Sequence, residues 1–309
     1  MEEMILDSKY PKGIWGSTLL TVNKMNKVDW VAFSEQVDIM CASSLHGIYT
    51  NGTAAECHNQ TDSEFDKLSE IVADKASKNN KLFQLGVSHT NPRIARERLS
   101  RLTSLNPNGF QFTLPDWWPP TLNEVKNFTL GMEEVAKNIP LILYNPPHAK
   151  VLLSPVERAN LRKHTPSLVG SKCVGGDEDW YKKIRDNLDN FSVFVPGHTV
   201  VFGRPLGASG SYSNVACLSP NGAVMVWNLI ESDINRAIEI EKRFNTFLQT
   251  CILPFAKTIS NTGLDKILTA AGGWGPVSEK LLWPYDSANS EDTKKIAKIA
   301  RNDLPELFE

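Results

Sequence analysis

The sequence predicts an α/β fold, a (β/α)₈ TIM barrel with a C-terminal helical extension. Short apolar runs alternate with longer amphipathic segments, and strands that alternate with helices form a parallel sheet covered by helices. Eight such units in about 230 residues fit a closed barrel better than an open doubly wound sheet, which is the alternative. No G-x-G-x-x-G sequence follows the first run, and this disfavours a dinucleotide-binding fold.

The candidate strands are apolar runs of four to seven residues. They span residues 15–21, 47–50, 82–87, 109–112, 140–144, 168–172, 191–195 and 210–213. The candidate helices between them are amphipathic and span residues 30–40, 63–76, 92–102, 122–137, 155–162 and 179–187. Two helix starts have recognisable caps, because Glu64 follows Thr61 by three residues and Pro155 follows Ser154.

Beyond residue 225 the pattern is purely helical, with segments 228–249, 252–262, 263–271 and 290–307. No linker rich in proline, glycine or serine precedes this part. We therefore expect residues 12–225 to form the barrel and residues 226–309 to form a helical segment packed on it.

The composition limits the classes of function. The 309 residues contain 33 Lys and Arg against 35 Asp and Glu, so no positive surface for nucleic acid is expected. No run approaches the ~20 apolar residues of a membrane span, and the acidic start is unlike a secretory signal. Five cysteines without a C-x-x-C pair indicate reduced thiols and a cytoplasmic protein. The histidines show no H-x-x-x-H spacing, so no metal site is expected.

Reactive side chains end two neighbouring strands of the predicted barrel. Lys172 closes the apolar run 168–172, where partial desolvation would lower the pKa of its amine and make it nucleophilic. The alternative is that its amine extends into solvent. Tyr144 ends the preceding strand and could transfer a proton to or from a substrate carbonyl, or simply pack at the rim. Carboxyl ends of barrel strands surround one mouth, so the two side chains are expected to meet there.

The loop after the second strand reads Asn51-Gly52-Thr53-Ala54-Ala55-Glu56. Its small residues would let backbone N–H groups approach an anion such as a substrate carboxylate, and Thr53 adds a hydroxyl. The alternative is an ordinary turn before a helix.

Taken together, these segments resemble the dihydrodipicolinate synthase/N-acetylneuraminate lyase family of class I aldolases. Residues 52–56 resemble the family's G-[TS]-T-G-E loop, residues 144–147 match its Y-N-x-P turn, and residues 170–172 match its G-x-K strand. Weaker similarities lie at residues 115–121, 207–215 and 275–277, so the likeness spans roughly residues 12–300.

The resemblance implies that Lys172 forms a Schiff base with pyruvate or another 2-oxo acid. It implies Tyr144 as the proton shuttle, Thr53 as its hydroxyl relay, and the amides near Thr53 and Ala54 as the site for the substrate carboxylate. It also implies a homo-oligomer, a tetramer or dimer, that needs no metal or organic cofactor. The substrate-binding residues expected on this basis are Gly52, Ala54, Trp117 and Ser211.

Departures from the family pattern narrow the expected function. Ala54 replaces a threonine, Trp117 replaces a tyrosine, and His148 and Ala149 stand where synthases have an arginine for the second substrate's carboxylate. A neighbouring lysine does not replace a bidentate arginine. We expect a lyase that is not a true dihydrodipicolinate synthase and that acts on a 2-oxo acid and an aldehyde. The alternatives are a hydro-lyase of a 2-oxo-3-deoxy sugar acid using the same imine, and a non-catalytic barrel that binds 2-oxo acids.

Overall fold

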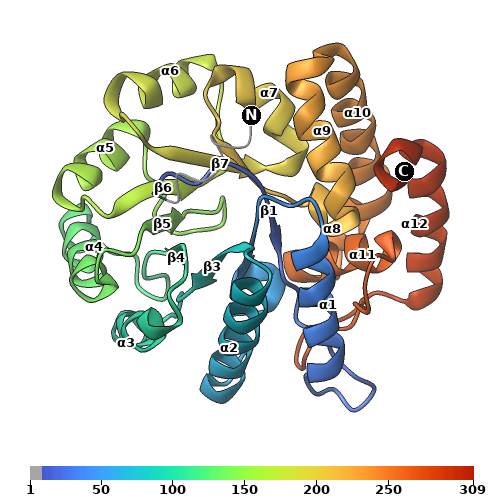
Figure 1. The fold of residues 1–309 in the computed structure, drawn as a ribbon, viewed down its shortest axis with the longest axis horizontal. Helices are drawn as coiled ribbons and strands as arrows, with labels where there is room; N and C mark the ends of the chain where they lie inside the picture. The colour runs from blue at the N-terminus through green and yellow to red at the C-terminus, as the bar shows by residue number, and fades with distance from the viewer. Residues whose placement is uncertain (1–8) are drawn as a thin grey trace.

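The computed structural model describes residues 9–309 and contains a closed barrel of eight parallel strands in sequence order (Figure 1). β1 pairs with both β2 and β8, which closes the barrel. The strands are β1 (Gly13–Ser17), β2 (Gly47–Thr50), β3 (Leu82–Gly86), β4 (Gly109–Phe112), β5 (Leu141–Tyr144), β6 (Leu168–Lys172), β7 (Ser192–Pro196) and β8 (Gly210–Tyr212). The predicted (β/α)₈ barrel with C-terminal helices is confirmed.

The first strand differs from its predicted range of 15–21. It begins at Gly13 and ends at Ser17, since Ser17 is the last residue of β1 that pairs with β2. The following segment leaves the sheet, and Thr21 donates its hydroxyl proton to the backbone oxygen of Asp29 at 2.7 Å. Residues 18–21, which include Leu19 and Leu20, therefore belong to a loop that is buried against α1.

Helices follow the strands and cover the outside of the barrel (Figure 1). The predicted capping box of Thr61 and Glu64 is present, and Ser154 caps the helix that begins at Pro155. The barrel helices are α1 (Trp30–Ala42), α2 (Asp62–Lys78), α3 (Pro92–Leu102), α4 (Leu122–Ala136), α5 (Pro155–His164), α6 (Glu178–Asn187), α7 (Val200–Leu206) and α8 (Val215–Leu218). The sequence patterns did not predict α7 and α8, because both are too short to show a helical period.

The C-terminal helices gather on one side of the barrel, next to α1 and α8 (Figure 1). They are α9 (Pro220–Ser232), α10 (Ile234–Phe247), α11 (Asn261–Gly272) and α12 (Ser290–Asp303). The predicted helix 228–249 is divided between α9 and α10, because Asp233 leaves the helical conformation and caps α10. A division of the chain at residue 225 stays a prediction. No helix within residues 9–309 has the length and hydropathy needed to span a membrane.

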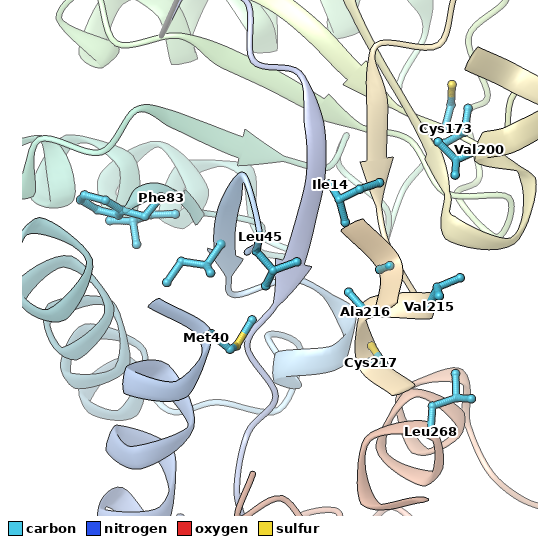
Figure 2. Packing of buried hydrophobic residues seen from close by; sticks show 14 of the residues in the cluster. Ile14, Met40, Leu45, Phe83, Cys173, Val200, Val215, Ala216, Cys217 and Leu268 are labelled. Atoms are coloured by element: carbon cyan, nitrogen blue, oxygen red, sulfur yellow. The ribbon is translucent and has the colours of Figure 1, made fainter. Parts of the chain in front are cut away.

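Apolar side chains fill both the interior of the barrel and the layer between sheet and helices. Trp15, Ile142, Val169, Phe194 and Tyr212 form the interior cluster. In the outer layer, Met40 and Leu45 lie beside β1 (Figure 2), where a Cβ at residue 16 would come within 2.7 Å of Leu45. Because the interior is filled, open space for a ligand is left at the ends of the strands.

Candidate active site

Lys172 and Tyr144 lie side by side where β6 and β5 end. They are register partners in the sheet, so both side chains project from the same level of the barrel. The Nζ atom of Lys172 lies 4.7 Å from the centroid of the Tyr144 ring. The Tyr144 hydroxyl lies 3.1 Å from the Thr53 hydroxyl, a hydrogen bond in which either oxygen can donate. An amine, a phenol and an alcohol thus follow one another at the mouth of the barrel.

Contacts with α11 hold Thr53 in place. It begins a short 3₁₀ helix, Thr53–Ala55, and its backbone oxygen accepts a hydrogen bond of 3.0 Å from the Thr262 hydroxyl. The 3₁₀ helix ends at Glu56, whose φ is 55°. The Glu56 carboxylate forms a fully buried ion pair of 2.5 Å with Lys266. Burial lowers the pKa of Lys266, and the charge of Glu56 opposes that shift.

A cavity of about 380 Å³ opens in front of Lys172. Stacked rings form part of its wall, since the centroids of Tyr49 and Tyr212 lie 4.2 Å apart. Burial raises the pKa of both phenols well above the usual value, so their hydroxyls stay protonated. The polar residues that complete the lining are Ser17, Tyr144, His148, His198, Thr199, Ser213, Asn214, Asn261 and Asp265.

Two titratable groups of this cavity have shifted pKa values. Burial raises the pKa of Asp265 to about 7, although the nearby charge of Lys172 lowers it. Burial lowers the pKa of His198, and the charge of Lys172 acts in the same direction, while the hydrogen bond to Asn214 opposes both. His198 is therefore a neutral imidazole at neutral pH, held by the Asn214 amide at 2.9 Å from Nδ1.

A second cavity, of about 240 Å³, adjoins the first. Tyr144, Pro146 and His148 line both cavities, while Thr53 lines only the second of the two. Burial lowers the pKa of His58 and His89, which also line this second space. Tyr144 therefore lies between the cavity lined by Lys172 and the cavity lined by Thr53.

The other predicted site residues lie at the edge of this arrangement or outside it. Gly52 caps the 3₁₀ turn of Thr53, and a side chain at residue 52 would come within 3.2 Å of the Tyr49 ring. Ala54 is buried against Leu19 and Val277. Ser211 is buried within β8, and its hydroxyl has no hydrogen-bond partner in the described part of the chain. Trp117 is 81% exposed and does not line the cavity of Lys172.

Asp265 is the acidic lining residue that sequence reasoning missed. It lies on α11, far along the chain from Lys172, and no motif connected the two. The sequence offers one weak signal, an acidic residue in a helical segment with apolar residues at Leu264, Ile267 and Leu268. Asn214 and His198 are brought together only by the ends of β8 and β7.

The arrangement suits covalent chemistry on a carbonyl compound. An amine that is partly shielded from water is a nucleophile when it loses its proton, and a phenol within reach can move protons to and from an oxygen. Among residues 9–309 there is no group of three or more His, Cys, Asp or Glu side chains that could hold a metal ion.

Known proteins similar to this chain include synthases and lyases. The chain is 23% identical to a 4-hydroxy-tetrahydrodipicolinate synthase of Staphylococcus carnosus, over 91% of this chain and 93% of the relative. It is 22% identical to an N-acetylneuraminate lyase of Escherichia fergusonii, over 88% and 93%. Its fold is similar to the sialic acid aldolase of Ruminococcus gnavus, with a TM-score of 0.80 and 18% identity over 97% of this chain and 98% of that one.

These relatives confirm the expected resemblance and the expected enzyme class, a lyase of the class I aldolase type. The model of the dihydrodipicolinate synthetase family matches residues 10–302, nearly the whole chain. The chain belongs to the dihydrodipicolinate synthetase family.

Proposed function

We propose that the chain is a Schiff-base-forming lyase that acts on pyruvate or a related 2-oxo acid and is not a dihydrodipicolinate synthase. The observation that carries this proposal is the contiguous series of Lys172, Tyr144 and Thr53, with Nζ 4.7 Å from the tyrosine ring and the two hydroxyls 3.1 Å apart. The proposed reaction type, a lyase reaction, is that of the lyases in the family.

In the proposed reaction, the neutral amine of Lys172 attacks the carbonyl carbon of the 2-oxo acid. The resulting carbinolamine takes up a proton on its oxygen through Tyr144 and loses water, which leaves a protonated imine. Tyr144, which has given up its proton, then takes the proton of the substrate hydroxyl next to the scissile C–C bond. The imine accepts the electron pair of that bond, so an aldehyde leaves and an enamine remains. Protonation of the enamine carbon and addition of water then release pyruvate and restore the amine. Thr53 passes protons between the Tyr144 hydroxyl and the second cavity.

The absence of an arginine supports the distinction from synthases. His148 and Ala149 follow the tyrosine turn, and the described lining of the Lys172 cavity contains no guanidinium. A carboxylate on the second substrate would therefore have no bidentate partner there. Ala54 has no hydroxyl to offer a substrate, unlike a threonine, and its side chain is buried against Leu19 and Val277.

On the basis of the family, we extend the proposal to the cofactor requirement, the oligomeric state and the cellular location. The enzyme would use no metal or organic cofactor, because the lysine imine itself accepts the electrons. It would be a cytoplasmic homo-oligomer, a tetramer or dimer. Trp117 and Trp118 are each 81% exposed, and a subunit contact would cover such a patch.

Replacing Thr53 with valine is expected to lower kcat about tenfold, since one hydrogen bond to the Tyr144 hydroxyl is lost while the side-chain volume is kept. KM for the 2-oxo acid is expected to change less than kcat. Steady-state kinetics of the variant and of Thr53→Ser, which restores the hydroxyl, provide the measurement. A valine variant with unchanged kcat would remove Thr53 from the proton relay.

The function is tested by incubating the enzyme with a series of 2-oxo-3-deoxy sugar acids and following pyruvate release and the other product by NMR. The proposal predicts pyruvate and an aldehyde from at least one acid, and no turnover of pyruvate with aspartate semialdehyde. A product that retains the whole carbon chain and has lost water would establish the hydro-lyase alternative. Binding of 2-oxo acids without any turnover would establish the non-catalytic alternative.

A further inference from the structure

The cavity of Lys172 contains one other side chain that carries a formal charge, the carboxylate of Asp265. Asp265 lies one helical turn after Asn261 on α11, and both residues line the cavity. The position of this helix is fixed on either side of Asp265. Thr262 donates to the backbone of Thr53, and Lys266 forms the buried ion pair with Glu56. Asp265 is therefore held at the same mouth as the proposed nucleophile.

The Asp265 carboxylate has no protein partner of its own. Neither of its side-chain oxygens forms a hydrogen bond or ion pair with any residue in the range 9–309. Burial raises the pKa of this carboxyl to about 7, which reflects the cost of an ionised group without hydrogen-bond donors. A partly buried polar group without a partner, in a cavity, is the kind of group that a ligand satisfies.

Three of the remaining polar residues around Asp265, namely His198, Asn214 and Asn261, are neutral. Lys172 is the only lysine in the described lining, and in the proposed reaction its charge is neutralised by the carboxylate at carbon 1 of the substrate. His198 is neutral because burial lowers the pKa of its imidazole. Asn214 and Asn261 offer amide donors and acceptors. A substrate tail that extends toward α11 therefore finds partners for hydroxyl groups but no cation for a second carboxylate.

We propose that Asp265 is a specificity-determining residue that favours 2-oxo acids with a neutral, hydroxylated tail over those with an anionic tail. When Asp265 is ionised, above its pKa of about 7, hydroxyl groups donate hydrogen bonds to its carboxylate, whereas a carboxylate in the tail is repelled by it. This inference rests on the proposed function, because it requires that the substrate be attached to Lys172.

The test compares two acids of five carbons, 2-oxo-3-deoxypentonate and 2-oxoglutarate, whose tails end in hydroxyl groups and in a carboxylate. Each is incubated with the enzyme and cyanoborohydride at a pH above the pKa of Asp265, so that its carboxyl is ionised. The fraction of reduced adduct is measured by intact-protein mass spectrometry over a range of concentrations. For each acid, the concentration that gives half of the maximal adduct is determined. The ratio of these two concentrations measures the preference for one tail over the other, and a change in the reactivity of Lys172 affects both acids equally and leaves the ratio unchanged. We expect the wild type to favour the hydroxylated acid about tenfold or more, and Asp265→Asn to reduce that preference to about threefold or less.

Three further variants keep the test specific. Asp265→Glu retains the charge and is expected to keep the wild-type preference, while Asp265→Ser repeats the loss of charge if the asparagine variant does not fold. Glu241→Gln is the matched control. Glu241 is a partly buried carboxyl on α10 whose pKa burial raises to about 7, but it accepts a hydrogen bond of 2.8 Å from the Val201 amide and does not line the cavity. Its replacement is expected to leave the ratio unchanged.

Two results would overturn the inference. One is a ratio that Asp265→Asn and Asp265→Ser leave at the wild-type value, and the other is an equal change in Glu241→Gln. A wild-type enzyme that forms no adduct with either acid, nor with pyruvate, would instead reject the proposed function, and the role of Asp265 with it. The two failures are distinguished by whether any adduct is formed.

Discussion

Replacing Lys172 with alanine is expected to abolish turnover, with a loss of at least about 10³-fold, because no other amine within residues 9–309 is placed beside Tyr144 to form the imine. Lys172→Arg is expected to be equally inactive, since a guanidinium retains its proton and cannot attack a carbonyl. The fold should be unaffected, because the side chain extends into the cavity and Nζ has no hydrogen bond within residues 9–309. Turnover of an active 2-oxo acid, measured beside the circular dichroism spectrum, provides the comparison.

Lys150 offers the matched control for Lys172. It lies just after the tyrosine turn, is exposed, and donates from Nζ to the backbone oxygen of Trp117 at 3.1 Å. Lys150→Ala is therefore expected to retain activity within about twofold, as is usual for exposed substitutions. An alanine variant at 172 with more than a tenth of wild-type activity would contradict the assignment of the nucleophile.

Replacing Lys266 with methionine is expected to lower the free energy of unfolding by about 3–5 kcal/mol, because the Glu56 carboxylate would stay buried without its cation. The change should also reduce activity, since the ion pair fixes α11 against the loop that carries Thr53. Urea unfolding followed by tryptophan fluorescence measures the stability, and the slope of the transition shows whether the compactness of either state has changed.

Two comparisons make the result for Lys266 specific. The double variant Glu56→Gln/Lys266→Met removes both charges and is expected to be more stable than the single variant, because it buries no unpaired ion. Lys182→Met breaks an exposed ion pair with Asp186 on α6 and should cost less than about 1 kcal/mol. If Lys266→Met also cost less than about 1 kcal/mol, the buried pair would not be what holds α11 in place.

Much of the barrel could be predicted from local sequence. The run 168–172 is β6 as predicted, because its first four residues are buried and an apolar run is the signature of a strand covered on both faces. The starts of α2 and α5 could also be located from local sequence, because a helix cap depends on residues only three positions apart. The placement of Lys172 beside Tyr144 followed from the rule that the ends of parallel strands meet at one mouth.

The rest depends on contacts between distant segments. Glu56 and Lys266 are 210 residues apart, and nothing in either segment indicates that they meet in a buried ion pair. For the same reason Asp265 could not be assigned to the cavity of Lys172 before the path of α11 was known. Trp117 is exposed and lies outside the cavity of Lys172 in the single chain, so its role in substrate binding stays a prediction.

The most direct measurement of the central claim is the mass of the peptide that contains residue 172 after the enzyme has been incubated with pyruvate and cyanoborohydride. Our account predicts that this peptide gains the mass of pyruvate less one water plus two hydrogens, that fragmentation places the addition on Lys172, and that Lys172→Ala gains nothing. An unmodified Lys172 peptide, or an equal addition to exposed lysines such as Lys150, would contradict the account.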